Sequence, residues 1–459
     1  MIKDFYKNNK LIIILFLFST LFFIYQRNSG GVHWDFALYV SNAKYLFSNG
    51  FYFEWWVPPF TPFLLGSFSI FGWFLAEYVY IIFVSSLFLF SCLKFSEVFK
   101  INKTFFYATF INSYVLYHGL RNGTELLSLS FLILFFTLFF KKNKEFKSSM
   151  FLSLSFLTRY SNIFLLPLIF LKKNLKIIFF NFLIFFILLI PWLLYNYVIS
   201  GNPLTSLSDY YVFIYLQKLY YGDEIISYIS LFIIGFFVIT FIALRKKLRK
   251  FLDLKDASMV FLIVIVIVSF LNMPFKDLRY LFNISLPIIY FFVKFTTKFK
   301  KILYLIIAIN FITIMTIIPL YTSAEDIYFR NFKFEENCML MSNAWVYFDY
   351  YDIPTEPYPW QEFFDKKVEE GYRIILFKWI REPDYVKNET FLAQFPIIEN
   401  TSNYVIIGNK NICKEFYKIN KTFTERKNEF LLTKNSTIKE EINCHKDILS
   451  KVLCNILEI

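Results

Sequence analysis

The sequence predicts an α-helical membrane protein with many spans, followed by a small α/β domain. Hydrophobic residues make up 57% of the 459 residues and charged residues only 18%, whereas a soluble domain is about 45–50% apolar and about 25% charged. Residues 1–320 are apolar runs separated by short Lys-rich stretches, and residues 321–459 are mixed and polar. The net charge of +13 comes mainly from these short stretches, so it indicates membrane orientation and no nucleic-acid partner.

The apolar runs of the first domain have the length of membrane spans, for which about 20 residues are needed. The first run lacks a small-residue cleavage site, so we expect a retained helix and no cleaved signal peptide. Candidate spans are 11–25, 77–93, 104–118, 124–140, 177–199, 225–244, 257–271, 281–293 and 302–320.

The segment 148–171 is either one helix or a short hairpin broken within 158–162. Only the hairpin places every Lys-rich loop, including 245–250, on the side of the N-terminus, as the positive-inside rule favours. The sequence therefore predicts about 11 spans in a cell membrane, with the N-terminus cytoplasmic and the C-terminal domain extracytoplasmic. The hairpin tip would lie within the membrane, in a cavity lined by protein or water.

The first outer loop, 26–72, carries the candidate site. Apolar residues from Phe36 to Phe47 recur with a helical period, which predicts an amphipathic helix in the outer interface that ends near Gly50. Asp35 stands at its start, either as an N-cap or as a site residue. Glu54 is either a solvated loop acid or a second site acid, and 62–71 is a further short helix.

Several basic residues fall on the predicted outer side, against the prevailing bias. Converging from different loops, they would hold a phosphate at the membrane surface. Alternatively, each extends to lipid headgroups or pairs with Asp277 or Glu125. The residues are Arg121, Arg159, Lys276 and Arg279.

These segments together resemble the GT-C glycosyltransferases. The resemblance rests on Trp34-Asp35, Tyr39, Asn42 to Leu46, Gly50 and the prolines at 58, 59 and 62, and on 157–160, 191–204 and 276–287. It covers residues 10–320 and is nearest to archaeal members related to protein O-mannosyltransferases and the lipid A aminoarabinose transferase (glycosyltransferase family 39-like).

The resemblance implies a hexosyl- or pentosyltransferase that uses a polyprenyl-phosphate-linked (for example dolichyl) sugar donor on the outer membrane face. Asp35 would be the catalytic base or its close partner, and the acceptor hydroxyl would belong to a protein, a lipid or a glycan. Many relatives carry Asp-Glu at this point, but Phe36 follows Asp35. The second acid would come from elsewhere, with Glu54 the first candidate.

In this scheme Arg279, Lys276, Arg159 and Arg121 would stabilise the charge on the leaving phosphate. Tyr280, Tyr160 and Lys44 would support them, and displacement in one step would invert the anomeric centre. The sequence shows no metal-ligand spacing and no required cofactor. A divalent ion held by Asp35 and Glu54 remains open.

The C-terminal domain, 321–459, alternates strand-like and helical stretches. The patterns predict strands at 337–346, 373–378 and 404–408, and a helix at 361–371 that ends at Gly371. Its four cysteines, at 338, 413, 444 and 454, are either free or form one or two disulfides.

A transporter or flippase of lipid-linked sugars is the alternative function, because outer basic residues would serve it too. Such a protein is expected to show similar halves or helices broken at midplane. The sequence shows no repeat, and its long first outer loop favours an enzyme. A structural membrane scaffold would leave the outer Asp and Arg residues unexplained.

Overall fold

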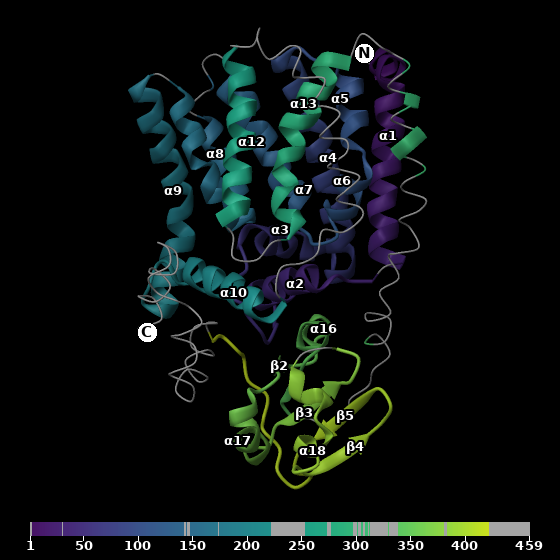
Figure 1. Ribbon diagram of the computed structural model, residues 1–459, viewed down its shortest axis with the longest axis vertical. Coiled ribbons are helices and arrows are strands. Elements are labelled where there is room, and N and C mark those ends of the chain that lie inside the picture. The colour runs from purple at the N-terminus through teal and green to yellow at the C-terminus, as the bar shows by residue number, and fades with distance from the viewer. Residues whose placement is uncertain are drawn as a thin grey trace.

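The structure, a computed structural model, is mostly helical and ends in a small sheet (Figure 1). It describes residues 2–29, 31–141, 144, 147–172, 174–221, 253–272, 277–296, 301, 304–305, 308–310, 312, 329, 338–380 and 383–421.

Four described helices are long and apolar enough to cross a membrane: α1 (Ile2–Ser29), α4 (Trp73–Phe99), α9 (Leu175–Ser200) and α12 (Leu254–Asn272). Each agrees with an expected span. The expected span 225–244 lies outside the described residues, and 302–320 lies mostly outside them.

The expected span 104–118 is two short helices instead, α5 (Lys103–Phe110) and α6 (Ser113–His118). The backbone leaves the helical region at Ile111, and the Asn112 side chain then accepts from the backbone N–H of Val115 at 3.0 Å. An Asn side chain is a strong N-cap, so it begins a new helix within the apolar run.

Helix α7 (Glu125–Phe139) forms the centre of the helical domain and packs on both α4 and α8. Nearly all of its residues are buried, and it is apolar on all sides, as expected of a helix surrounded by others.

The segment 148–171 is a hairpin. Helix α8 (Ser148–Thr158) ends where Arg159 adopts an extended backbone, and the 3-10 helix η3 (Tyr160–Leu171) follows and packs on α8. The Lys172 ammonium lies 4.7 Å from the ring centre of Phe139, at the last turn of α7. Helix α8 therefore starts near the C-terminal end of α7, and η3 ends near the same place. This is the hairpin that the charge pattern predicts.

Helix α2 (Trp34–Phe47) is the expected helix of the first outer loop, but Asp35 is not its N-cap. His33 takes that place, and its Nδ1 accepts from the Asp35 backbone N–H at 3.3 Å. The Asp35 carboxylate in the first turn is therefore free to face another element. Gly50 closes the helix because a Cβ there would lie 2.6 Å from the Lys44 carbonyl carbon.

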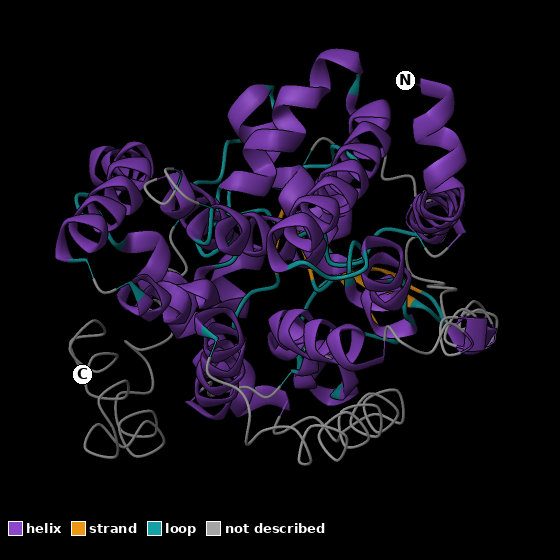
Figure 2. Cartoon of the chain, turned by 90° about the horizontal axis from the view of Figure 1, so that it is seen from above, coloured by secondary structure: helices purple, strands orange, loops and turns teal. Residues whose placement is uncertain are grey.

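Shorter elements complete this region: α3 (Phe60–Phe68), η1 (Ser69–Phe71), α10 (Thr205–Tyr221), η5 (Leu278–Ile284) and α13 (Ser285–Thr296). Helices α2 and α10 lie across the ends of the long helices, between them and the C-terminal domain (Figure 1). Seen from above, the helices pack side by side and the few strands lie behind them (Figure 2).

The C-terminal domain is a small α/β unit, as predicted. Its sheet has the order β2-β1-β3-β5-β4, in which β1 is parallel to β2 and β3, and β5 is antiparallel to β3 and β4. The strands are β1 (Leu340–Ser342), β2 (Thr355–Pro357), β3 (Arg373–Phe377), β4 (Ile397–Asn400) and β5 (Tyr404–Ile407). Its helical elements are α16 (Trp345–Tyr350), η7 (Gln361–Phe363), α17 (Phe364–Glu369), η8 (Asp384–Lys387) and α18 (Glu389–Leu392).

Two of the expected strands, 373–378 and 404–408, are confirmed as β3 and β5, and the helix expected at 361–371 is η7 followed by α17. The strand expected at 337–346 is wrong over its second half, because α16 begins at Trp345 and packs its aromatic side chains against α2. Cys338 and Cys413 form a disulfide. Cys444 and Cys454 lie outside the described residues.

Candidate functional site

A cavity of about 50 Å³ lies where α2, α7, the α8–η3 break and η5 meet. One wall is apolar and the other carries charged side chains from four segments of the chain. The lining residues are Asp35, Leu38, Tyr39, Trp56, Val57, Pro58, Thr124, Glu125, Arg159, Tyr160, Tyr210, Phe213, Ile214, Arg279 and Tyr280.

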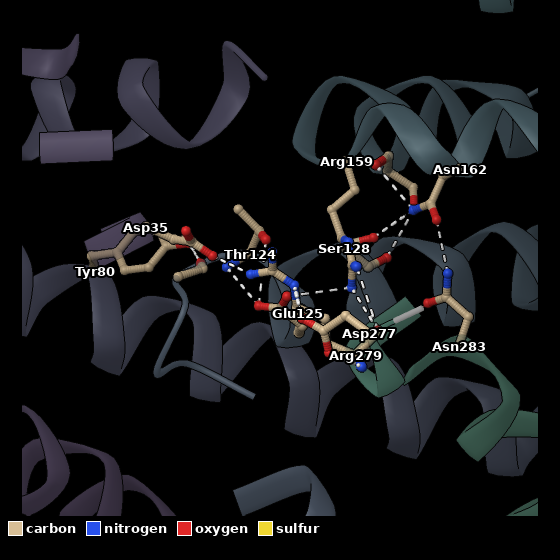
Figure 3. Close-up of polar contacts among 12 residues, drawn as sticks. Asp35, Tyr80, Thr124, Glu125, Ser128, Arg159, Asn162, Asp277, Arg279 and Asn283 are labelled. Atoms are coloured by element: carbon tan, nitrogen blue, oxygen red, sulfur yellow. Dashed lines mark hydrogen bonds and ion pairs between the residues drawn. The ribbon is translucent and has the colours of Figure 1, made fainter. Parts of the chain in front are cut away.

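Arg279 joins two carboxylates at one edge of this cavity (Figure 3). Its guanidinium is ion-paired with the carboxylate of Asp35, which lies 244 residues away in the sequence. Its Nε lies 2.6 Å from Oδ2 of Asp277, whose other oxygen accepts from the Arg279 backbone N–H at 2.9 Å. Asp277 thus caps η5 and fixes the arginine that η5 carries toward α2.

A second ion pair joins Arg159, at the hairpin break, to Glu125, at the first turn of α7. Their Nη1 and Oε1 atoms are 3.5 Å apart. The Arg159 guanidinium also donates from both terminal nitrogens to the Arg279 carbonyl oxygen, each at 3.4 Å. The two arginines therefore line the same cavity and are also in direct contact, through the backbone of Arg279.

The two ion pairs differ in their access to the cavity. The side chains of Asp35 and Arg279 are 18% and 17% exposed, whereas those of Glu125 and Arg159 are 2% and 8% exposed. A ligand that enters the cavity meets the Asp35–Arg279 pair first, and Glu125–Arg159 forms its floor.

Neighbouring charges set the protonation of Asp35 and His33. Burial raises the pKa of the Asp35 carboxyl, but the charge and hydrogen bond of Arg279 outweigh it, and the pKa lies below its ordinary value. Burial lowers the pKa of His33 to about 4, assisted by the charges of Arg121 and Arg279 and opposed by Asp35. At neutral pH Asp35 is a carboxylate beside a neutral imidazole.

Five of the residues expected at the site line the cavity: Asp35, Arg159, Arg279, Tyr160 and Tyr280. The Tyr280 ring centre lies 5.9 Å from the Arg159 guanidinium carbon and 5.7 Å from that of Arg279. The Tyr160 hydroxyl accepts from the indole N–H of Trp192 at 2.8 Å, which fixes its ring at the cavity wall.

Three other expected residues do not line the cavity. Glu54 is buried, and its carboxylate accepts from the Tyr52 hydroxyl at 2.7 Å. Lys44 donates to the Asp352 carboxylate at 2.8 Å and so contacts the C-terminal domain. Arg121 donates to the Tyr117 hydroxyl, and its guanidinium lies over the Tyr117 ring.

Lys276, the remaining expected phosphate ligand, lies outside the described residues. Glu125 and Asp277 line or support the site, although sequence reasoning treated them only as partners for basic residues. The signal for Glu125 was a lone acid at the start of an otherwise apolar run. In the structure it takes the place beside Asp35 that Glu54 was expected to fill.

The arrangement suits an anionic ligand more than a metal ion. Among the described residues, no group of three or more His, Cys, Asp and Glu side chains is placed to hold a metal. Asp35 and Glu54, the expected pair for a divalent ion, have different partners. Two guanidinium groups at one cavity offer forked donors to a phosphate, and the adjacent carboxylates offer proton acceptors.

No protein-family model, curated protein or solved structure matches the chain.

Proposed function

We propose that the protein is a membrane glycosyltransferase of GT-C type that transfers a sugar from a polyprenyl-phosphate-linked donor to an acceptor hydroxyl. The proposal rests on one observation above all: Asp35 and Arg279, 244 residues apart, meet at a cavity that Arg159 and Glu125 also line. The sequence pattern predicts all four on the outer side or in its interface, with Glu125 as a pairing acid.

The ion pair between Asp35 and Arg279 gives the site two states. Without a ligand, Asp35 neutralises Arg279 and is a weak base, because Arg279 lowers its pKa. A donor phosphate that binds Arg279 and Arg159 replaces this contact. The Asp35 carboxylate then loses its counter-charge and becomes a stronger base at the moment when the substrate is present.

The transfer step then needs no further reactant. The acceptor oxygen attacks the anomeric carbon, the bond from that carbon to the phosphate oxygen breaks, and its electron pair stays on the phosphate. Asp35 takes the proton of the acceptor hydroxyl. Arg279 and Arg159 stabilise the negative charge that builds on the leaving phosphate, which is commonly the largest contribution to such catalysis.

The apolar wall of the cavity supports a lipid-linked donor. Trp56 and Phe213 are stacked there with ring centres 3.9 Å apart, and Leu38, Val57 and Ile214 lie on the same lining. A wall of this kind would exclude water from the phosphate and contact the first part of an isoprenoid chain.

The test is sugar transfer by the purified chain in lipid nanodiscs, with radiolabelled polyprenyl-phosphate sugars and a mixture of hydroxyl acceptors. We expect labelled product from the wild type and about 10³-fold less from Arg279→Gln. The control is Lys294→Gln, which breaks the buried Asp256–Lys294 ion pair between α12 and α13, away from the cavity lining. Equal transfer by both variants would contradict the proposal.

Transport of lipid-linked sugars is the second candidate, and the helix break at Arg159 favours it, because transporters use broken helices beside a substrate site. The same nanodisc preparation decides between the two. An enzyme changes the mass of the acceptor, whereas a transporter leaves donor and acceptor chemically unchanged and moves the donor across a proteoliposome membrane.

A further inference from the structure

A row of buried polar side chains lies behind the two cavity arginines (Figure 3). The Asn162 amide nitrogen donates to the Ser128 hydroxyl at 2.6 Å and to the Ser155 hydroxyl and carbonyl at 2.8 and 3.2 Å. The Asn283 amide nitrogen donates to the Asn162 carbonyl oxygen at 2.8 Å. These contacts join α7, α8, η3 and η5.

The orientation of both amides follows from chemistry. The Ser155 carbonyl can only accept, so Asn162 must present its NH2 group to it, and its oxygen then faces Asn283. Asn283 in turn must present its NH2 group. Each replacement that removes one partner leaves a buried polar group unsatisfied, which costs about 1–3 kcal/mol. The network therefore fixes the four segments in one register.

Each asparagine belongs to the same short segment as one of the arginines. The Asn162 backbone N–H donates to the Arg159 carbonyl at 3.0 Å, and Asn283 lies one turn after Arg279 within η5. Both segments are 3-10 helices, whose hydrogen bonds have poorer geometry than those of α-helices and which often mark hinges. An amide contact between two such segments holds them together where their own backbone bonds are weak.

One atom of the network lacks a hydrogen bond: the Asn283 carbonyl oxygen finds no partner among the described residues, although it is buried. An apolar side chain at 283 would avoid this cost, but it would also remove the donor to the Asn162 carbonyl oxygen. The contact with Asn162 is therefore made at the expense of one unsatisfied oxygen.

We propose that the Asn162–Asn283 amide pair is a positioning device that holds Arg159 and Arg279 at the spacing at which both guanidinium groups bind one phosphate. The inference rests on the proposed function, since it names how that site recognises its phosphate. Neither asparagine lines the cavity, so both are positioning residues and neither is catalytic.

The experiment compares binding of farnesyl phosphate and farnesol by the full chain in detergent, measured by quenching of tryptophan fluorescence. Farnesol carries the same chain without the phosphate, so the ratio of the two affinities reports on the arginine pair alone. We expect Asn283→Leu to weaken farnesyl phosphate binding about tenfold, because small misplacements of binding groups are costly, and to leave farnesol binding unchanged. Asn283→Gln keeps the amide donor and is expected to restore part of the preference.

Asn181→Leu is the matched control. Asn181 is equally buried, accepts from the Ser149 hydroxyl at 2.8 Å, and also has one amide atom without a hydrogen bond, but it contacts α8 away from the cavity. Its replacement is expected to leave the affinity ratio unchanged. Ser128→Ala, which removes one of three acceptors of Asn162, is the milder variant if Asn283→Leu fails to fold, and a smaller loss in the same direction is expected.

Equal losses for farnesyl phosphate and farnesol in the Asn283 and Ser128 variants would overturn the inference, since that is the result of a merely structural role. Unchanged binding of both compounds by these variants would overturn it as well, while leaving the proposed function intact. A wild-type protein that binds both compounds equally would instead overturn the phosphate site itself.

Discussion

At its first turn α2 presents Asp35 to a cavity, whereas at its last turn it buries Lys44 beneath the C-terminal domain. Lys44 is held by the Asp352 carboxylate and by the Tyr350 carbonyl at 2.6 Å. The Asp35–Arg279 pair is 17–18% exposed, and the Lys44 side chain is 6% exposed. One helix thus has a charged end open to ligands and a charged end closed by protein.

The closed end is satisfied by groups within the chain. Tyr350 accepts from Arg27 and donates to Glu77 at 2.5 Å, so a tyrosine of the C-terminal domain completes a polar cluster of α1 and α4. The open end has its arginines satisfied by carboxylates that a phosphate would replace. Charged groups therefore stabilise the fold at the closed end, and at the open end they are accessible to a ligand.

The largest expected effect concerns the open end. Arg279→Gln removes the ion pair and, under the proposed function, one ligand of the donor phosphate, so we expect sugar transfer to fall about 10³-fold. Thermal unfolding of the purified variant checks that the loss is not one of folding. A variant that unfolds at a much lower temperature but keeps its turnover per folded molecule would contradict this prediction, because Arg279 would then serve stability and not transfer.

Loss of the Cys338–Cys413 disulfide is expected to destabilise only the C-terminal domain, which covers the Lys44 end of α2. The two cysteines are 75 residues apart in the sequence, and closing a loop of this length stabilises a domain by about 4 kcal/mol. We expect Cys338→Ser with Cys413→Ser to expose the domain to limited proteolysis. Resistance of the variant equal to that of the wild type would show that the disulfide adds little.

Asp349 makes the closed end sensitive to pH. Burial raises its pKa to about 7, opposed by the nearby Ser41 hydroxyl and by the charge of Lys44 and assisted by Asp352. The folded protein therefore keeps a proton that the unfolded chain loses near the ordinary carboxyl pKa of 3.8, and the free energy of unfolding falls as pH rises from about 4 to about 7.

We expect Asp349→Asn to remove this dependence and to stabilise the contact by at least about 1 kcal/mol above pH 7. Hydrogen exchange of the α16 amides as a function of pH measures it. Asp365→Asn is the control, because Asp365 is exposed on α17 and is not among the groups that shift the pKa of Asp349. A variant of Asp349 with the same pH profile as the wild type would disprove the assignment.

The smallest expected effect is that of Tyr350→Phe. It removes one hydroxyl from the cluster, but Arg27 and Glu77 remain paired with each other at 2.5 Å, so we expect the free energy of unfolding to fall by only about 0.5–1 kcal/mol. Transfer per folded molecule should not change. Reduced turnover in a variant that is as stable as the wild type would instead show that Tyr350 affects transfer at the cavity.

Much of the fold followed from local pattern. The period from Phe36 to Phe47 predicted α2, and charge parity predicted the hairpin that breaks at Arg159. The division at Ile111 was missed because an apolar run hides an Asn cap, and β2 and β4 were missed because three or four residues carry little pattern.

The site was predicted in part, for a similar reason. Asp35, Arg159 and Arg279 were identifiable as charges in unusual places. Their pairing was not, because Asp35 and Arg279 are 244 residues apart and meet only in the tertiary structure. Glu54 was expected in place of Glu125 because it follows α2 closely in the sequence, but its carboxylate is buried against Tyr52.

The most direct test of the open end is Asp35→Asn, measured for both sugar transfer and farnesyl phosphate binding in one preparation. If Asp35 is the base, transfer falls at least about 10²-fold in this variant. If the phosphate displaces Asp35 from its ion pair with Arg279, the variant binds farnesyl phosphate as tightly as the wild type or more tightly. Undiminished transfer, or a parallel loss of binding and transfer, would contradict the account.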